Sequence, residues 1–148
     1  MVTWAEFESA APDLAAEGRR LIYSRGDGEG LLATVRDDLP PRIHPINVAI
    51  VDRLLYAFIL RSPKRLDLEH DGRFVLHTQQ DPAAPSEFSV RGRAHLVEED
   101  AVRSAVAAAW YFGVDETYHL FEFSIEAALL EARAPGEWPT FHHWTPAG

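Results

Sequence analysis

The sequence predicts a mainly β protein with a few helices, folded as a small antiparallel barrel with the helices at its edges. About six stretches are rich in β-branched and aromatic residues or alternate between apolar and polar positions, as strands do. Short, turn-like segments connect most of these stretches, and short connections join antiparallel neighbours. Only two or three stretches have helical periodicity. Because so few helices cannot cover a sheet as a layer, we expect a barrel with helices at its edges.

The composition indicates one compact domain spanning residues 1–148. A chain of this length buries roughly two-thirds of its unfolded surface, which suffices for a core without cross-links. The absence of cysteine excludes disulfides, cysteine-based zinc sites and thiol nucleophiles. A formal net charge of −9 argues against nucleic acid as a partner. The N-terminus does not read as a signal peptide and no apolar stretch is long enough for a membrane span, so we expect a cytoplasmic protein with no membrane partner.

The N-terminal part is predicted to begin with a helix and to continue with strands. Thr3 starts a capping box, and one helical face carries the apolar residues Trp4, Phe7, Ala11 and Leu14. Residues 21–23 either extend this helix or start a strand. After a glycine-rich turn at residues 24–30, residues 31–38 and 46–60 read as strands, and the second of these stretches folds back at Asp52-Arg53.

A short helix is predicted over residues 62–72, with Ser62 as its N-cap, Pro63 at the first helical position and Gly72 just beyond its end. A strand at 73–80, a loop at 81–86, a long alternating strand at 87–99 and a second helix at 99–113 follow. The last strand is expected at 118–132, although its alanine- and leucine-rich end is also compatible with a helix. The tail from 135 to 148 contains three prolines and no periodicity, so we expect an extended arm.

Lys64 is the only lysine of the chain, whereas arginine occurs thirteen times. It lies at the start of the predicted short helix, where free backbone N–H groups and the helix dipole favour an anion. The next residue, Arg65, adds a second positive charge. An ammonium is a compact point charge that suits a phosphate group. The residues alone leave two interpretations open, a phosphate-binding pair or a solvated basic pair on an exposed turn.

The stretch from 40 to 77 resembles the pyridoxamine 5'-phosphate oxidase-like family of FMN-binding split-barrel proteins. The resemblance rests on Arg42 at the start of one strand, on Ser62-Pro63-Lys64 at the end of the next, and on an R-x-x-L strand that starts at Arg73. A Gly-Arg-Ala sequence in the following long strand and a tryptophan near the C-terminus extend it over roughly residues 4–144. The resemblance implies a six-stranded antiparallel split β-barrel of the FMN-binding type. It also implies a homodimer with two FMN molecules at the subunit interface.

The same resemblance implies where the cofactor would lie. The FMN phosphate would contact Arg42 and Ser62/Lys64, with Arg65 beside them, and the ring would lie against the strand that carries His44, Pro45 and Asn47. Trp144, in the C-terminal arm, offers a flat face to cover the ring. We identify no catalytic residue.

Two departures from the family pattern bear on the activity. Pyridoxamine-phosphate oxidases usually carry a second phosphate-site lysine five residues after the strand arginine, where this chain has Asn47. Their S-R-P-x-x-S-Q-I-G-A-W signature for the substrate phosphate is missing from the matching region, residues 100–116. We therefore expect an FMN-dependent oxidoreductase of unassigned small-molecule substrate or reductant, without genuine pyridoxamine-phosphate oxidase activity. The alternative is a non-catalytic carrier or sensor, and F420 or haem is the alternative cofactor because relatives bind them.

Two further expectations concern metals and assembly. Adjacent histidines at 142 and 143 in an extended tail point to opposite sides, so we expect no metal site. The aromatic run at 110–112 is expected in core or dimer packing. The homodimer is expected to bury the alternating residues Phe88, Val90 and Gly92 of the long strand.

Overall fold

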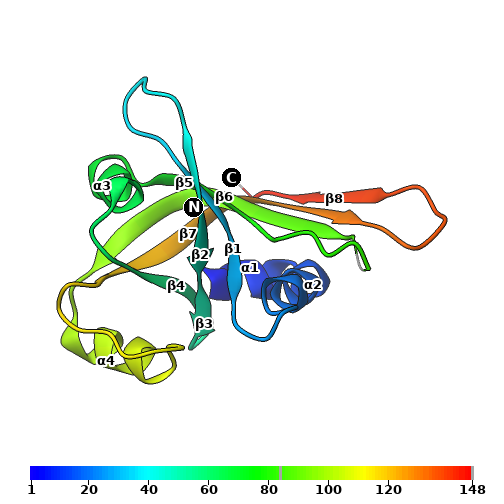
Figure 1. Cartoon of the computed structure of the whole chain (residues 1–148). Coiled ribbons are helices and arrows are strands. Elements are labelled where there is room, and N and C mark those ends of the chain that lie inside the picture. The colour runs from blue at the N-terminus through cyan, green and yellow to red at the C-terminus, as the bar shows by residue number, and fades with distance from the viewer. Residues whose placement is uncertain (84, 148) are drawn as a thin grey trace.

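The computed structural model describes residues 1–83 and 85–147. The helices are α1 (Trp4–Ala10), α2 (Pro12–Ile22), α3 (Pro63–His70) and α4 (Asp100–Ala108). The strands are β1 (Glu29–Thr34), β2 (Arg42–Asn47), β3 (Ala49–Val51), β4 (Leu54–Ile59), β5 (Arg73–His77), β6 (Glu87–Val97), β7 (His119–Ala132) and β8 (Thr140–Trp144). All strand pairs are antiparallel, and the mainly β fold class is confirmed (Figure 1).

The sheet closes into a barrel because β2 and β3 stand at the two ends of its strand order, β2-β1-β5-β6-β7-β4-β3, and only Val48 separates them. At this corner the Val48 N–H donates to the Gly28 carbonyl at 3.0 Å. The Tyr111 hydroxyl donates to the Val48 carbonyl at 2.6 Å and accepts the Gly28 N–H at 2.9 Å. Burial raises the pKa of Tyr111, so this hydroxyl stays protonated and continues to donate.

The described residues form eight strands where the sequence predicted six. One difference is the interruption of the stretch 42–51 at Val48, where the backbone turns the barrel corner. The other is β8, which was expected only as an extended arm. Residues 140–144 instead pair with 128–132 of β7, because the turn after β7 returns the chain along its free edge. The end of β7 is a strand and not a helix.

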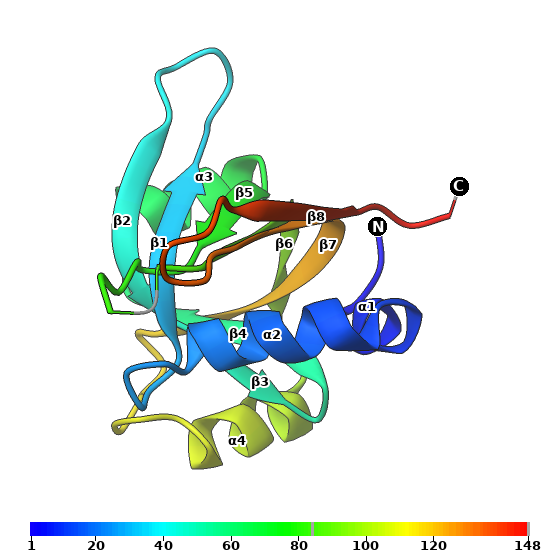
Figure 2. The same ribbon diagram turned by 90° about the vertical axis from the view of Figure 1, so that its right-hand side faces the viewer.

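The N-terminal helices close one end of the barrel (Figure 2). The predicted capping box at Thr3 is present, but the predicted single helix is two, because Pro12 starts a new helix after Ala11. Residues 21 and 22 extend α2. Trp4 and Phe7 of α1 are buried against Phe88, with their ring centroids 6.2 and 6.4 Å from that of Phe88, so the helices plug the barrel.

The local turn chemistry follows the sequence prediction. Asp52 and Arg53 both have positive φ and form the two-residue turn of the β3–β4 hairpin. Ser62 caps α3, and Gly72, with φ of 84°, lies just beyond its C-cap. These elements bring the end of β4 and the start of α3 to one side of the barrel.

No helix within residues 1–83 and 85–147 is long and apolar enough to cross a membrane.

The prediction that Phe88, Val90 and Gly92 of the long strand form the dimer interface is wrong. Phe88 and Val90 are each 1% exposed and Gly92 is buried, because they face the barrel interior. A register shift between Arg91 and Gly92 brings Gly92 close to β7, where a Cβ atom would lie 1.9 Å from the Ser124 carbonyl oxygen. The residues of β6 that alternate with this inward set are polar or charged, and the exposed apolar side chain of the strand is Leu96, at 44% exposure near its end.

Candidate functional site

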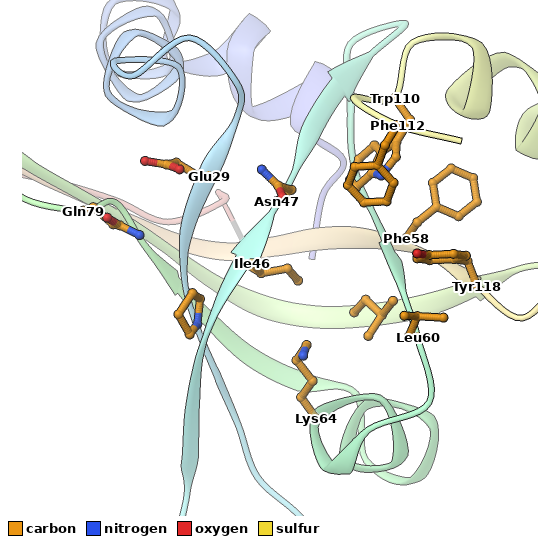
Figure 3. A pocket seen from close by; sticks show the side chains of 12 residues that line it. Glu29, Ile46, Asn47, Phe58, Leu60, Lys64, Gln79, Trp110, Phe112 and Tyr118 are labelled. Atoms are coloured by element: carbon orange, nitrogen blue, oxygen red, sulfur yellow. The ribbon is translucent and has the colours of Figure 1, made fainter. Parts of the chain in front are cut away.

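A cavity of about 320 Å³ lies where β2 and β4 diverge, in the split of the barrel (Figure 3). Ligand pockets in proteins start at about this size. Its wall combines residues of β2, the end of β4, α3, and the segment between α4 and β7. The lining residues are Glu29, Pro45, Ile46, Asn47, Phe58, Ile59, Leu60, Lys64, Gln79, Trp110, Phe112 and Tyr118.

Lys64 forms the charged end of this cavity. It is half-buried in the first turn of α3, and its ammonium points into the cavity between the strands (Figure 3). Within residues 1–83 and 85–147 Lys64 makes no side-chain hydrogen bond or ion pair. Ser62 accepts the Arg65 N–H at 3.4 Å and donates to the Leu60 carbonyl at 2.9 Å. Ser62 therefore fixes the start of α3, and Lys64 is the side chain of this turn that is available to a ligand.

Arg42 is held beside this turn by a buried carboxylate. Asp67, one helical turn after Lys64, is 1% exposed. It accepts the Arg42 Nε–H at 3.0 Å and the Thr34 hydroxyl at 2.8 Å through the same oxygen. The Arg36 Nε lies 3.4 Å from its other oxygen. Two guanidinium groups thus share one carboxylate, so the cluster keeps a net positive charge.

His44 lies close enough to Lys64 and Arg42 for their positive charges to influence its pKa. Its pKa is lowered, first by burial and then by the charges of Lys64 and Arg42, against the opposing effect of Asp67. The ring is therefore neutral near neutral pH. Its Nε2 is buried and has no hydrogen-bond partner among the described residues. In a chain of net charge −9, this positive region is a local feature suited to an anion.

Aromatic side chains form the wall opposite the lysine. Phe58 of β4 packs edge-on against Trp110 with ring centroids 5.4 Å apart, and Phe112 and Tyr118 complete the wall. Trp110 and Phe112 were expected in core or dimer packing. Trp110 is indeed 8% exposed, but it also lines the cavity. A planar ring would find a flat apolar surface at this end.

The structure places Pro45 and Asn47 in the lining of the cavity. Their contact with a cofactor ring stays a prediction. The Asn47 side-chain amide donates to the Gly28 carbonyl at 3.1 Å, so part of its hydrogen-bonding capacity is used by the fold. Arg42 and His44 lie beside the cavity at the Asp67 cluster.

Five expected cofactor residues are absent from the lining of the cavity: Arg42, His44, Ser62, Arg65 and Trp144. The first three lie beside it, whereas Arg65 and Trp144 are engaged elsewhere. Arg65 is 7% exposed and donates to the Thr117 carbonyl at 2.9 Å, so it ties α3 to the chain before β7. It follows Lys64 directly, but successive helical residues point about 100° apart. Trp144 pairs through β8 with Ala128 and packs against Phe7, with ring centroids 4.9 Å apart. Within one chain it covers the helical plug and not the cavity.

Sequence reasoning missed Thr34, Arg36 and Asp67. The i, i+3 spacing of Lys64 and Asp67 was a usable signal, because it places both side chains on one face of α3. The two arginines that contact Asp67 come from β2 and the β1–β2 connection, and no local pattern links them to it. No group of three or more metal-ligating side chains occurs in the part of the chain that the structure describes.

No family model matches the sequence, and no curated protein matches it. Solved structures do match. A haem-binding protein from Mycobacterium smegmatis matches with a TM-score of 0.65 and 19% identity. The match covers 88% of this chain and 57% of that one. The haem storage protein HutZ from Vibrio cholerae has a TM-score of 0.62 and 18% identity over 76% of this chain and 90% of that one. A putative pyridoxamine 5'-phosphate oxidase from Listeria innocua has a TM-score of 0.62 and 15% identity over 78% of this chain and 95% of that one.

At these identities the matches show the fold. The chain has the split-barrel fold shared by the Listeria oxidase-like protein and the two proteins named for haem, and the resemblance inferred from the sequence is confirmed at that level.

Proposed function

We propose that this protein binds FMN in the split of the barrel and acts as a flavin-dependent oxidoreductase on a small-molecule substrate. One observation carries the proposal: the cavity has a lysine ammonium at a helix start on one side and an aromatic wall on the other. FMN has the same division, with a phosphate at one end and a planar ring at the other. The combination of a cation and an aromatic wall in one cavity favours this ligand over a purely apolar one.

The charges of the cluster match a phosphate monoester. Lys64, Arg42 and Arg36 are cationic and Asp67 is anionic, which leaves two positive charges. A phosphate monoester carries nearly two negative charges at neutral pH, because its second pKa is about 6. In this proposal Lys64 and Arg42 hold the phosphate, while Ser62 fixes the helix start. Pro45 and Asn47 line the path of the ring along β2.

The bound flavin would supply the hydride chemistry, and the chain would supply position and electrostatics. The Lys64 end anchors one end of the ligand, and Phe58, Trp110 and Tyr118 exclude water at the other. Neutral His44 beside the cavity can donate a hydrogen bond without adding charge. The missing substrate-phosphate signature at residues 100–116 argues against pyridoxamine 5'-phosphate as the substrate.

The proposal includes a homodimer that closes the open side of the cavity. The outward face of the sheet carries exposed apolar residues on four strands: Ile43 at 65%, Val75 at 39%, Leu129 at 38% and Phe141 at 65% exposure. This face replaces the one expected from β6. Ser89 and Arg91 of β6 lie between Val75 and Leu129 on this face. A second copy is the occupant that we propose, because these side chains lie on the outer surface of paired strands, where a self-complementary contact can form about a twofold axis.

The test is a titration of the apo-protein with FMN and with riboflavin, which lacks the phosphate, followed by fluorescence. FMN should bind at least tenfold more tightly than riboflavin, because a charge-assisted phosphate contact is worth about 1.5 kcal/mol or more. Equal affinities would refute the phosphate site. Oxidation of NADH or NADPH by the FMN-loaded protein would then separate an enzyme from a carrier.

Haem binding is the second candidate function. Two matching structures are named for haem, and the buried Nε2 of His44 has no partner among the described residues, as a histidine that ligates iron would require. The absorption spectrum of the purified protein decides between haem, F420 and FMN, since their bands differ. A haem spectrum that His44→Ala alters would favour this candidate.

A further inference from the structure

The buried carboxylate of Asp67 is not explained by packing alone. A buried charge costs stability unless it is paired, and replacing such a group by an apolar one is often neutral or stabilising. Asp67 is 1% exposed, yet it lies on the face of α3 that also carries Lys64. Its contacts come from β1, β2 and their connection, so α3 fixes the lysine and an arginine of β2 relative to one another.

The way in which Asp67 holds Arg42 leaves the ligand-binding part of the guanidinium free. Asp67 accepts the Arg42 Nε–H at 3.0 Å. The two terminal nitrogens of Arg42 have no hydrogen-bond partner in the part of the chain that the structure describes, and the side chain is 39% exposed. A planar guanidinium fixed through Nε can present both terminal nitrogens to one phosphate as a fork.

We infer that Asp67 is a positioning residue, which orients the Arg42 guanidinium so that its terminal nitrogens and the Lys64 ammonium converge on the same phosphate. The inference rests on the proposed FMN site and adds to it the group that builds the geometry. Thr34 donates to the oxygen of Asp67 that accepts from Arg42, and Arg36 lies at the other oxygen. The Thr34 hydrogen bond helps to fix the carboxylate, and the ion pair with Arg36 compensates its charge.

Two possible roles of Asp67, an electrostatic one and a positioning one, predict opposite effects of removing its charge on the affinity for FMN. If Asp67 only weakened the positive potential, then Asp67→Asn would tighten FMN binding. If Asp67 positions Arg42, then Asp67→Asn weakens FMN binding, because the amide holds the guanidinium less firmly. The readout is the ratio of the riboflavin and FMN dissociation constants, which isolates the phosphate contact from any effect on the ring.

The experiment measures this ratio in a double-mutant cycle of the full chain. Asp67→Asn should lower the ratio about tenfold, the effect of a lost charge-assisted contact. In the Arg42→Ala background the same substitution should have no further effect, whereas in the Lys64→Ala background it should still lower the ratio. An unchanged or higher ratio for Asp67→Asn overturns the inference. Equal weakening of both ligands also overturns it, because that is the signature of a structural role only.

A second variant covers the case in which Asp67→Asn fails to fold. Arg42→Lys keeps the charge at a partly exposed position but has one nitrogen, which cannot pair with Asp67 and fork to a phosphate together. Its ratio should fall close to that of Arg42→Ala, and a parental ratio would overturn the inference. Equal affinity of the parent for FMN and riboflavin is a separate outcome, which refutes the proposed function and this inference with it.

Discussion

Lys64→Ala tests the chemical centre of the proposed site. In the structure the ammonium of Lys64 points into the cavity, and among the described residues it is not engaged by any carboxylate. Its removal should therefore affect a ligand far more than the fold. A hydrogen bond to a charged group is worth about 1.5–3 kcal/mol. Since about 1.4 kcal/mol corresponds to a factor of ten, the affinity for FMN should fall about 10- to 100-fold.

The assay is a fluorescence titration of the apo-protein with FMN, together with thermal unfolding in the absence of ligand. Lys64→Arg should restore only part of the affinity, because the planar fork cannot occupy the same point. Arg61→Ala is the matched control: it removes the same charge three residues earlier, from an exposed side chain that does not line the cavity. It should change the affinity less than about threefold, since the charge of an exposed residue is screened by salt.

If Lys64→Ala bound FMN as tightly as the parent protein, then Lys64 would be a solvated surface residue. If Arg61→Ala weakened binding as much as Lys64→Ala, the attraction would come from the overall potential of this surface and not from a specific contact. A lowered unfolding temperature for Lys64→Ala would mean that the lysine supports the fold.

Further predictions concern stability, assembly and pH. Gly92→Ala should destabilise the protein by at least about 3 kcal/mol in thermal unfolding, because its Cβ would lie 1.9 Å from a β7 carbonyl oxygen. Gly113→Ala is the control and should have little effect, since a Cβ there would have no atom within 4 Å. Equal effects of the two substitutions would contradict the close contact of Gly92 with β7. Val75→Asp should reduce the mass measured by light scattering from twice 16.6 kDa to 16.6 kDa. Trp138→Asp, at a 91% exposed position, is the control and should leave the mass unchanged. A parent protein that is already monomeric would contradict the dimer. The pKa of His44 is lowered in the free protein, so a histidine NMR titration should show it rise when the FMN phosphate offsets the nearby cations, and an unchanged pKa would argue against phosphate there. Without ligand, the pKa of His44 is lower in the folded protein than in the unfolded chain, where it is about 6.5. The unfolded chain therefore binds a proton first as the pH falls. The free energy of unfolding should decrease as the pH falls from about 6.5 toward the lowered pKa.

Several features of the protein could be predicted from the sequence because they depend on interactions within a few residues. The N-cap at Ser62, the end of α3 before Gly72 and the two-residue turn at Asp52-Arg53 all appear where the local pattern placed them. The alternation of β6 was also predicted. The chain closes its barrel as expected, since short connections leave antiparallel pairing as the only arrangement that satisfies the strand backbones.

The role of each charged or aromatic side chain depends on the tertiary structure. Lys64 and Arg65 are neighbours in sequence, but the helix directs the first into the cavity and the second to the carbonyl oxygen of Thr117. The alternation of β6 marks Phe88 and Val90 as members of its apolar face, but only the closed barrel shows that this face is covered within one chain and not by a second copy. The pairing of Asp67 with Arg36 and Arg42 joins α3 to segments more than twenty residues away, and the position of Trp144 depends on β8 returning along β7. Local sequence fixes where an element begins and ends, whereas the partner of a side chain depends on which distant strand the closed sheet brings beside it.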